Sequence, residues 1–193
     1  RLALNSYGAA RNFRNIWYHF PDMFNEFRSL VQSTWPGMDI EFPELEVVDG
    51  RLRLFMYCPE QRLPRELFWA GFGFQVWCQM LTYIVFSEKA SIFLIDEPDI
   101  YLHSDLKRQL LSILREMDSD VLIATHSTEI LSEAEFEEIV VVDKKKKRAA
   151  RVKDASQLST VFSALGSNLN PILTQISKTG KTVFLEGNDY QIL

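Results

Sequence analysis

The sequence has few cysteines and no excess of basic charge. Its 193 residues include two cysteines, Cys58 and Cys78, too few for a disulfide framework and at a spacing that fits no metal-binding motif. Acidic residues outnumber basic ones by 26 to 21, so the net charge of −5 gives the chain no overall electrostatic footprint for nucleic acid. A reducing cytoplasm is the simplest location, and any contact with DNA has to come from a local patch or from parts outside these residues.

Long apolar runs are missing as well. The longest apolar stretch, residues 71–86, is interrupted by Gln75, Gln79 and Thr82 and is too short to span a bilayer, so we predict no membrane segment. With 47% hydrophobic and 24% charged residues the chain can still bury an ordinary core, which excludes disordered and collagen-like classes.

A phosphate-binding loop is also absent. The pattern Gly-x-x-x-x-Gly-Lys-Ser/Thr is approached only at Gly180-Lys181-Thr182, where Gln175 stands in place of the first glycine. These residues precede an apolar strand candidate at 182–185, whereas a phosphate loop follows a strand and opens a helix. We therefore interpret this match as a decoy, that is, as a chance match that is not a phosphate-binding loop.

What is present begins with a helical pattern and a hairpin. Apolar residues recur at steps of three and four from residue 9 to 34, which predicts a helix that Pro21 interrupts or restarts. Residues 40–48 and 51–57 then flank Asp49-Gly50, a strong signal for a two-residue hairpin turn.

From residue 66 onward helices and strands alternate, which predicts the α/β class with a mainly parallel sheet. Ser104 is the expected cap of the helix over 105–117. The strands are short and wholly apolar, as is typical of parallel strands covered on both faces. The helices are expected at 74–86, 105–117, 128–134 and 157–165, and the strands at 91–95, 121–124, 139–142 and 150–152. The basic run 144–148 is either a solvated hairpin tip or a contact for a phosphate backbone.

Two adjacent carboxylates, Asp96 and Glu97, follow the strand over 91–95. Open α/β sheets place ligands at this carboxyl edge, and two anions are costly there unless a cation or a reaction uses them. In a nucleotide hydrolase the first carboxylate can hold Mg²⁺ and the second can orient and deprotonate the attacking water. His126 follows the next strand after one crossover helix, where its ring could bind a γ-phosphate and that water.

The series from Leu94 to Ser127 resembles the Walker B, D-loop and switch-histidine motifs of ABC-type ATPases, whose fold is that of a P-loop NTPase. The order Asp-Glu-Pro and then Leu-His is similar to the OLD (overcoming lysogenization defect) branch of AAA-type ATPases. By this resemblance Asp96 is associated with Mg²⁺, Glu97 is the general base for ATP hydrolysis and His126 is the switch histidine. The D-loop would contain His103, Ser104 and Asp105.

The segment Ala70-Gly71-Phe72-Gly73-Phe74-Gln75 stands where this family keeps its signature motif. The resemblance implies that Gly71, Gly73 and Gln75 contact a nucleotide bound to the partner subunit. Amides at a helix N-terminus can approach a phosphate only where no side chain blocks them. The family's usual serine is replaced by Ala70 or Phe72, and close helix packing is an alternative role for the glycines.

The last residues resemble the first motif of a TOPRIM nuclease domain, in which a glutamate after a strand acts near Mg²⁺. Glu186 matches that glutamate, and Asp189 comes one residue earlier than the family's aspartate. We expect four segments: the helix and hairpin region 1–65, the motif segment 66–150, a connecting helical segment 151–180 and the start of the TOPRIM domain at 181–193.

The resemblance as a whole implies an OLD-like, ATP-dependent endonuclease of phage defence whose ATPase heads pair in a homodimer or higher oligomer. The phosphate loop would lie before Arg1, the full-length protein would bind DNA, and the 193 residues alone would be inactive. One alternative is an ATP-operated dimerisation module that controls a partner effector without nuclease activity. Another is a scaffold that no longer hydrolyses ATP, which the altered signature suggests.

Overall fold

The computed structural model describes residues 12–61, 63–87, 89–143 and 147–165, which form two compact units divided between Ile123 and Ala124. The predicted strand at 182–185, the glycine-lysine decoy and Glu186 lie outside the described residues. No helix within the described ranges combines the length and apolarity needed to cross a bilayer.

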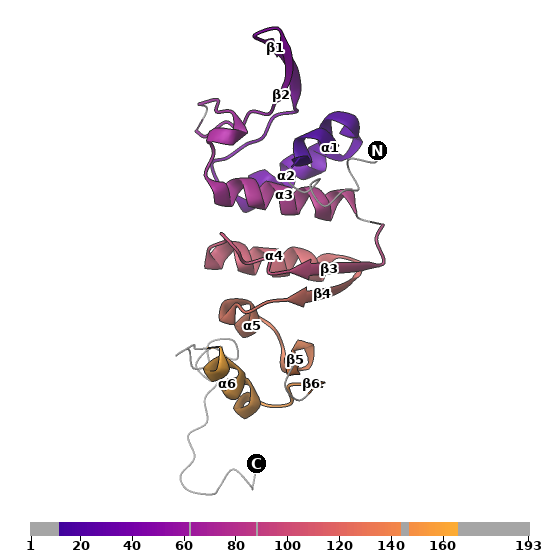
Figure 1. Cartoon of the computed structure of the whole chain (residues 1–193), viewed down its shortest axis with the longest axis vertical. Helices are drawn as coiled ribbons and strands as arrows, with labels where there is room; N and C mark the ends of the chain where they lie inside the picture. The colour runs from indigo at the N-terminus through magenta and orange to yellow at the C-terminus, as the bar shows by residue number, and fades with distance from the viewer. Residues whose placement is uncertain (1–11, 62, 88, 144–146, 166–193) are drawn as a thin grey trace, which may run out of the picture. The chain divides into compact units, whose positions relative to one another are not determined.

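The first unit starts with α1 (Phe13–His19), the short helix η3 (Pro21–Met23) and α2 (Phe24–Thr34) (Figure 1). The predicted interruption at Pro21 is confirmed, because the proline opens η3 and separates α1 from α2. Trp17 stacks on Phe27 with ring centroids 4.7 Å apart, so the two helices share an aromatic core.

The hairpin is also confirmed. Strands β1 (Glu44–Val48) and β2 (Arg51–Phe55) pair in antiparallel register, with Val48 opposite Arg51. Asp49 and Gly50 have φ values of 52° and 72°, the left-handed backbone that this tight turn requires.

Helix α3 (Phe72–Phe86) begins two residues earlier than the sequence predicts and is the central element of the first core. Two buried tryptophans fix it to the N-terminal helices through hydrogen bonds. Trp17 Nε1 donates to Thr82 Oγ1 at 2.9 Å, and Trp77 Nε1 donates to Thr34 Oγ1 at 2.8 Å. Each indole therefore buries its ring without leaving its N–H unsatisfied.

Strands β3 (Ile92–Asp96) and β4 (Asp120–Ala124) pair with each other and are joined by α4 (Ser104–Glu116). Their arrows point the same way in Figure 1, as the predicted strand-helix-strand unit requires. Ser104 is the first helical residue and His103 occupies the cap position, so the predicted serine cap is wrong.

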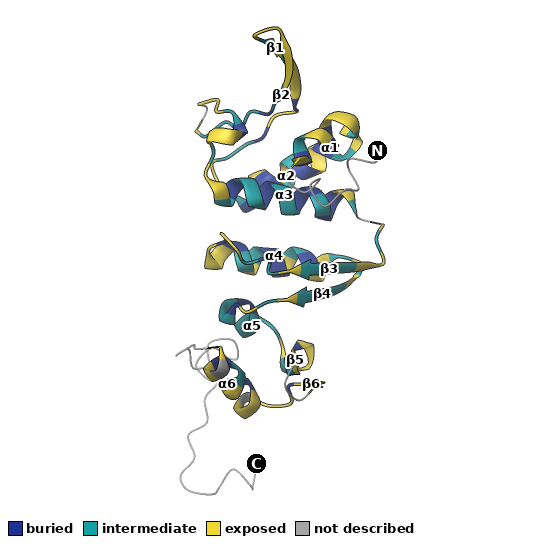
Figure 2. Ribbon diagram, in the orientation of Figure 1, coloured by how far each residue is buried: buried dark blue, intermediate teal, exposed yellow. Residues whose placement is uncertain are grey.

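The prediction that both faces of these strands are covered is also wrong for the described residues. Phe93 and Ile95 pack against the core, whereas Ile92 and Leu94 on the other face are 60% and 74% exposed (Figure 2). Leu122 of β4 is exposed on its strand in the same way. The described part of the chain therefore covers only one face of β3, although residues on both faces are apolar.

The second unit contains α5 (Thr128–Glu133), the short helix η5 (Phe136–Glu138), β5 (Val140–Asp143), β6 (Arg148–Arg151) and α6 (Ala155–Ala164). Ile139, Val152, Leu158 and Phe162 form its small core. Strand β5 pairs with β6 in antiparallel register, which confirms the hairpin around the basic run. The described strands thus form three two-stranded sheets in place of one mainly parallel sheet.

Candidate functional site

Asp96 is the last residue of β3 and is exposed at the carboxyl end of the strand. Glu97 follows in the left-handed region at φ 46°, and Pro98 behind it is buried. Tyr101 is also left-handed at φ 68°, so two strained residues bracket the turn that leaves the strand. Left-handed backbone in non-glycine residues occurs at tight turns and at functional sites. The catalytic role of the two carboxylates stays a prediction.

The predicted histidine follows β4 directly in the chain. Ser127 caps α5 by accepting a hydrogen bond from the Ile130 N–H at 3.5 Å, and its own N–H donates to Thr125 Oγ1 at 2.9 Å. These bonds shape the strand-to-helix turn on which His126 lies exposed. His126 belongs to the second unit, so its place relative to Glu97 stays a prediction.

The predicted D-loop lies at the start of α4. The His103 ring lies 5.6 Å from the Trp35 ring, and Asp105 forms an ion pair with Arg108 one turn along the helix. Both side chains of that pair are exposed, so the pair contributes little to stability. The arrangement leaves His103 and Asp105 on the surface of the first unit.

The two glycines of the predicted signature have different surroundings. A Cβ at Gly73 would lie 3.0 Å from the carbonyl oxygen of Tyr101, so this glycine permits close packing against the turn after β3. At Gly71 nothing lies within 4 Å, and no side chain caps the helix that starts there. The packing alternative therefore holds for Gly73, whereas Gly71 leaves the backbone open to a ligand.

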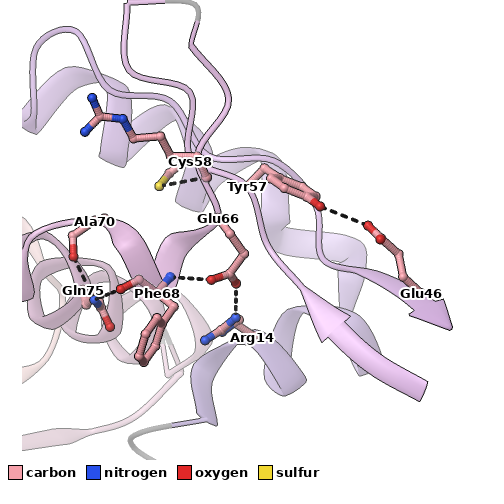
Figure 3. A network of polar contacts seen from close by, with 9 residues as sticks. Arg14, Glu46, Tyr57, Cys58, Glu66, Phe68, Ala70 and Gln75 are labelled. Carbon is pink, nitrogen blue, oxygen red and sulfur yellow. Dashed lines mark hydrogen bonds and ion pairs between the residues drawn. The ribbon is translucent and has the colours of Figure 1, made fainter. Parts of the chain in front are cut away.

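The Gln75 side chain faces the loop that leads into α3. Its Nε2 donates to the carbonyl oxygens of Ala70 at 2.9 Å and of Phe68 at 3.4 Å (Figure 3). Contact with a nucleotide stays a prediction for this residue.

Exposed aromatic side chains surround the signature glycines, and none of them is among the predicted site residues. The Phe72 and Tyr101 rings meet edge to face with centroids 4.6 Å apart. Phe68 and Trp69 are 68% and 76% exposed just before them in the chain. The sequence signal for this feature is the group of aromatic residues Phe68, Trp69 and Phe72 just before and within the signature segment.

No group of three or more metal-ligating side chains occurs among the residues that the structure describes. Mg²⁺ usually keeps several waters and takes one or two carboxylates together with substrate phosphates. Asp96, exposed at the strand end, offers such a carboxylate. An open cavity of about 460 Å³ beside Phe24 and Glu41 contains none of the motif residues, so we do not assign the nucleotide to it.

The chain is similar to known ATPases in sequence family and in fold. Residues 2–132, more than half of the chain, match the family described as "AAA domain, putative AbiEii toxin, Type IV TA system". The chain therefore belongs to this AAA domain family. No curated protein matches it.

Solved structures with a similar fold include heads of SMC ATPases. One, from work on ATP-driven dimerization and DNA-stimulated activation of SMC ATPases, has a TM-score of 0.59 at 13% identity over 81% of this chain and 99% of that one. An SMC head bound to the C-winged helix domain of ScpA gives 0.55 at 13% identity over 72% of this chain and 45% of that one. An SMC head from Pyrococcus yayanosii gives a TM-score of 0.51 at 15% identity over 74% of this chain and 28% of that one. The fold is thus that of an ABC-like ATPase.

Proposed function

We propose that Asp96, Glu97 and His126 carry ATP hydrolysis in an ABC-type head. The observation that carries this proposal is the pair of adjacent carboxylates at the carboxyl end of β3, with Glu97 held in a strained left-handed backbone. Membership of the AAA domain family supports it, since the class binds and hydrolyses ATP.

Each of the three residues has a separate task. Asp96 holds Mg²⁺, which when bound neutralises charge on the phosphates. Glu97 accepts a hydrogen bond from the attacking water and takes its proton as the γ-phosphate bond breaks. His126 donates a hydrogen bond from its neutral ring to the γ-phosphate and so senses whether it is present.

Two heads act together in this proposal. The open backbone at Gly71 and the exposed segment His103–Asp105 face a nucleotide held by the partner head. The described similarity to SMC ATPases, for one of which ATP-driven dimerization is stated, supports pairing of heads. We expect a homodimer or higher oligomer that closes on ATP and opens after hydrolysis.

The test is phosphate release from Mg-ATP by the intact protein that carries this chain. We expect turnover by the wild type and a loss of about 10²-fold or more in Asp96→Ala and His126→Ala. A wild-type protein that binds Mg-ATP without turning it over would contradict the proposal and would favour the non-hydrolysing scaffold.

At a finer level, we infer an OLD-like protein in which ATP turnover controls DNA cleavage by a TOPRIM domain that begins with Glu186. The Leu-His step at 102–103 after Asp-Glu-Pro supports the OLD branch. The second candidate is an ATP-operated module that controls a partner effector, and the toxin–antitoxin description of the matched family favours it.

The sequence that follows Leu193 and a DNA-nicking assay separate these two candidates. A nuclease requires an Asp-x-Asp motif on a later strand and loses Mg²⁺-dependent nicking in Glu186→Gln while it keeps ATP turnover. If Glu186→Gln leaves both activities unchanged, or no nicking occurs, the second candidate stands.

A further inference from the structure

The loop that leads into α3 is held from one side by an ion pair outside every predicted motif (Figure 3). Glu66 stands at the cap position of η4 (Leu67–Trp69), and one of its carboxylate oxygens accepts the Phe68 N–H at 2.7 Å. The other oxygen accepts a hydrogen bond from the Arg14 guanidinium on α1. The two side chains are only 27% and 13% exposed, so solvent screens this pair less than a surface pair.

Gln75 holds the same loop from α3. Its amide donates to the carbonyl oxygens of Ala70 and Phe68, so Phe68 is fixed at its N–H by Glu66 and at its carbonyl oxygen by Gln75. The loop thereby joins α1 to the first turn of α3 through polar contacts.

Apolar burial cannot supply the same restraint. Leu67 is buried at 1% exposure, whereas Phe68 and Trp69 are largely exposed. One anchored leucine fixes the position of the loop but not the direction of its following peptide groups. Backbone hydrogen bonds also hold this loop, from the Leu67 N–H to the Met56 carbonyl oxygen at 2.8 Å and from the Ala70 N–H to the Leu67 carbonyl oxygen at 3.1 Å. The charge-assisted bond from Arg14 and the two hydrogen bonds donated by the Gln75 amide add the side-chain restraint on the backbone just before Gly71.

We propose that Arg14, Glu66 and Gln75 are positioning residues that hold the backbone at Gly71 in the geometry required by the nucleotide of the partner head. The proposal rests on the proposed ATPase function and adds Arg14 and Glu66, which no motif contains. It gives Gln75 an action through the loop in place of direct contact with the nucleotide. A misplacement of about 1 Å in such a site can cost about 10²-fold in rate.

The first measurement uses the intact protein and compares kcat and KM for ATP in Glu66→Gln, Arg14→Met and Gln75→Leu. Each change removes a polar contact, and Glu66→Gln and Gln75→Leu do so at nearly constant side-chain volume. We expect kcat to fall about 10-fold or more while the affinity for Mg-ATP is unchanged. Arg14→Lys, which keeps the charge, should recover part of the loss.

Two matched controls separate this effect from general destabilisation. Asp39→Asn breaks another ion pair of the first unit, in which Arg28 Nε donates to Asp39 at 2.8 Å. Gln79→Leu repeats the glutamine substitution one turn further along α3. Both controls should lower the melting temperature at most and leave kcat near the wild-type value.

The decisive experiment pairs two defective heads. Glu66→Gln and Glu97→Gln chains, co-expressed with different tags, are purified as mixed dimers. Because the loop serves the partner's nucleotide, one of the two sites keeps both an intact Glu97 and an intact loop. We expect about half of the wild-type turnover, well above either homodimer. If Glu66→Gln does not fold, Arg14→Met takes its place.

The possible outcomes separate a failure of the positioning role from a failure of the proposed ATPase function. Mixed dimers no more active than the homodimers, or a fully active Glu66→Gln homodimer, would overturn the positioning role alone. Absence of turnover in the wild type, or full turnover in Glu97→Gln, would instead overturn the proposed ATPase function on which it rests.

Discussion

The two glycines at the start of α3 have different roles because their surroundings differ. Gly73 lies against the backbone of Tyr101, and Gly71 is open, although the sequence spaces them as one motif. The spacing could not separate the roles, because the carbonyl that approaches Gly73 comes from a turn about 30 residues later in the chain.

Replacing each glycine by alanine tests this difference. Gly73→Ala places a Cβ 3.0 Å from the Tyr101 carbonyl oxygen, so we expect destabilisation of about 1–3 kcal/mol. Gly71→Ala meets no atom within 4 Å and should cost less than about 1 kcal/mol as a change at a helix cap. Urea unfolding of both variants measures the two losses of stability. A loss in Gly73→Ala equal to or smaller than the loss in Gly71→Ala would contradict the packing role of Gly73.

The two thiols give a second prediction at the residue scale. Burial raises the pKa of Cys58 to about 11 and raises the pKa of Cys78 as well. Folding therefore favours the protonated thiols, and their contribution to stability is full below pH 9 and declines as the pH rises toward 11.

Alkylation with iodoacetamide at pH 8 should accordingly be slow in the folded protein and should reach both thiols only after unfolding in urea. We expect the thiols of the folded protein to react at least about 10-fold more slowly than a free thiol. Rapid modification of Cys58 in the folded protein would show that its burial is wrong.

At the scale of elements, β3 and β4 have one packed face and one exposed apolar face. Phe93, Ile95, Val121 and Ile123 pack toward the first core, whereas Ile92, Leu94 and Leu122 are exposed. The sequence predicts the strands correctly, because a four-residue apolar run after a helix is a strong signal. It cannot say which chain covers each face, since apolarity alone does not identify a neighbour.

Adjacent residues of β3 provide a matched test of this one-sided packing. In the 193-residue chain, Leu94→Thr should change the free energy of unfolding by less than about 0.5 kcal/mol, because the side chain is 74% exposed. Ile95→Thr removes packed apolar volume and buries a hydroxyl, so it should cost about 1–3 kcal/mol. A larger loss for Leu94→Thr than for Ile95→Thr would contradict the assigned faces.

At the scale of the whole molecule, local patterns predict most elements and few of their contacts. The interruption at Pro21, the Asp49-Gly50 turn and the order of helices and strands after residue 66 follow from turn chemistry and periodicity. Turn chemistry and periodicity do not predict three other features: the grouping of strands into three small sheets, the cap at His103 and the Gln75 contacts. These depend on distant segments, which periodicity does not report.

The candidate site follows the same division. The positions of Asp96 at the end of β3 and of His126 after β4 were predictable, because a strand that ends in polar residues is visible in the sequence. The strained backbone of Glu97 and the support of the signature loop by Arg14 and Glu66 were not. The family match over residues 2–132 includes all of these residues.

The most direct test of the central claim is the Glu97→Gln variant of the intact protein. Because glutamine keeps the size of the side chain but cannot take a proton from water, we expect unchanged Mg-ATP affinity and ATP-dependent pairing of heads. Hydrolysis in a single-turnover experiment should fall by about 10²-fold or more. Single-turnover hydrolysis at the wild-type rate in Glu97→Gln would show that this carboxylate is not the general base and would contradict the account.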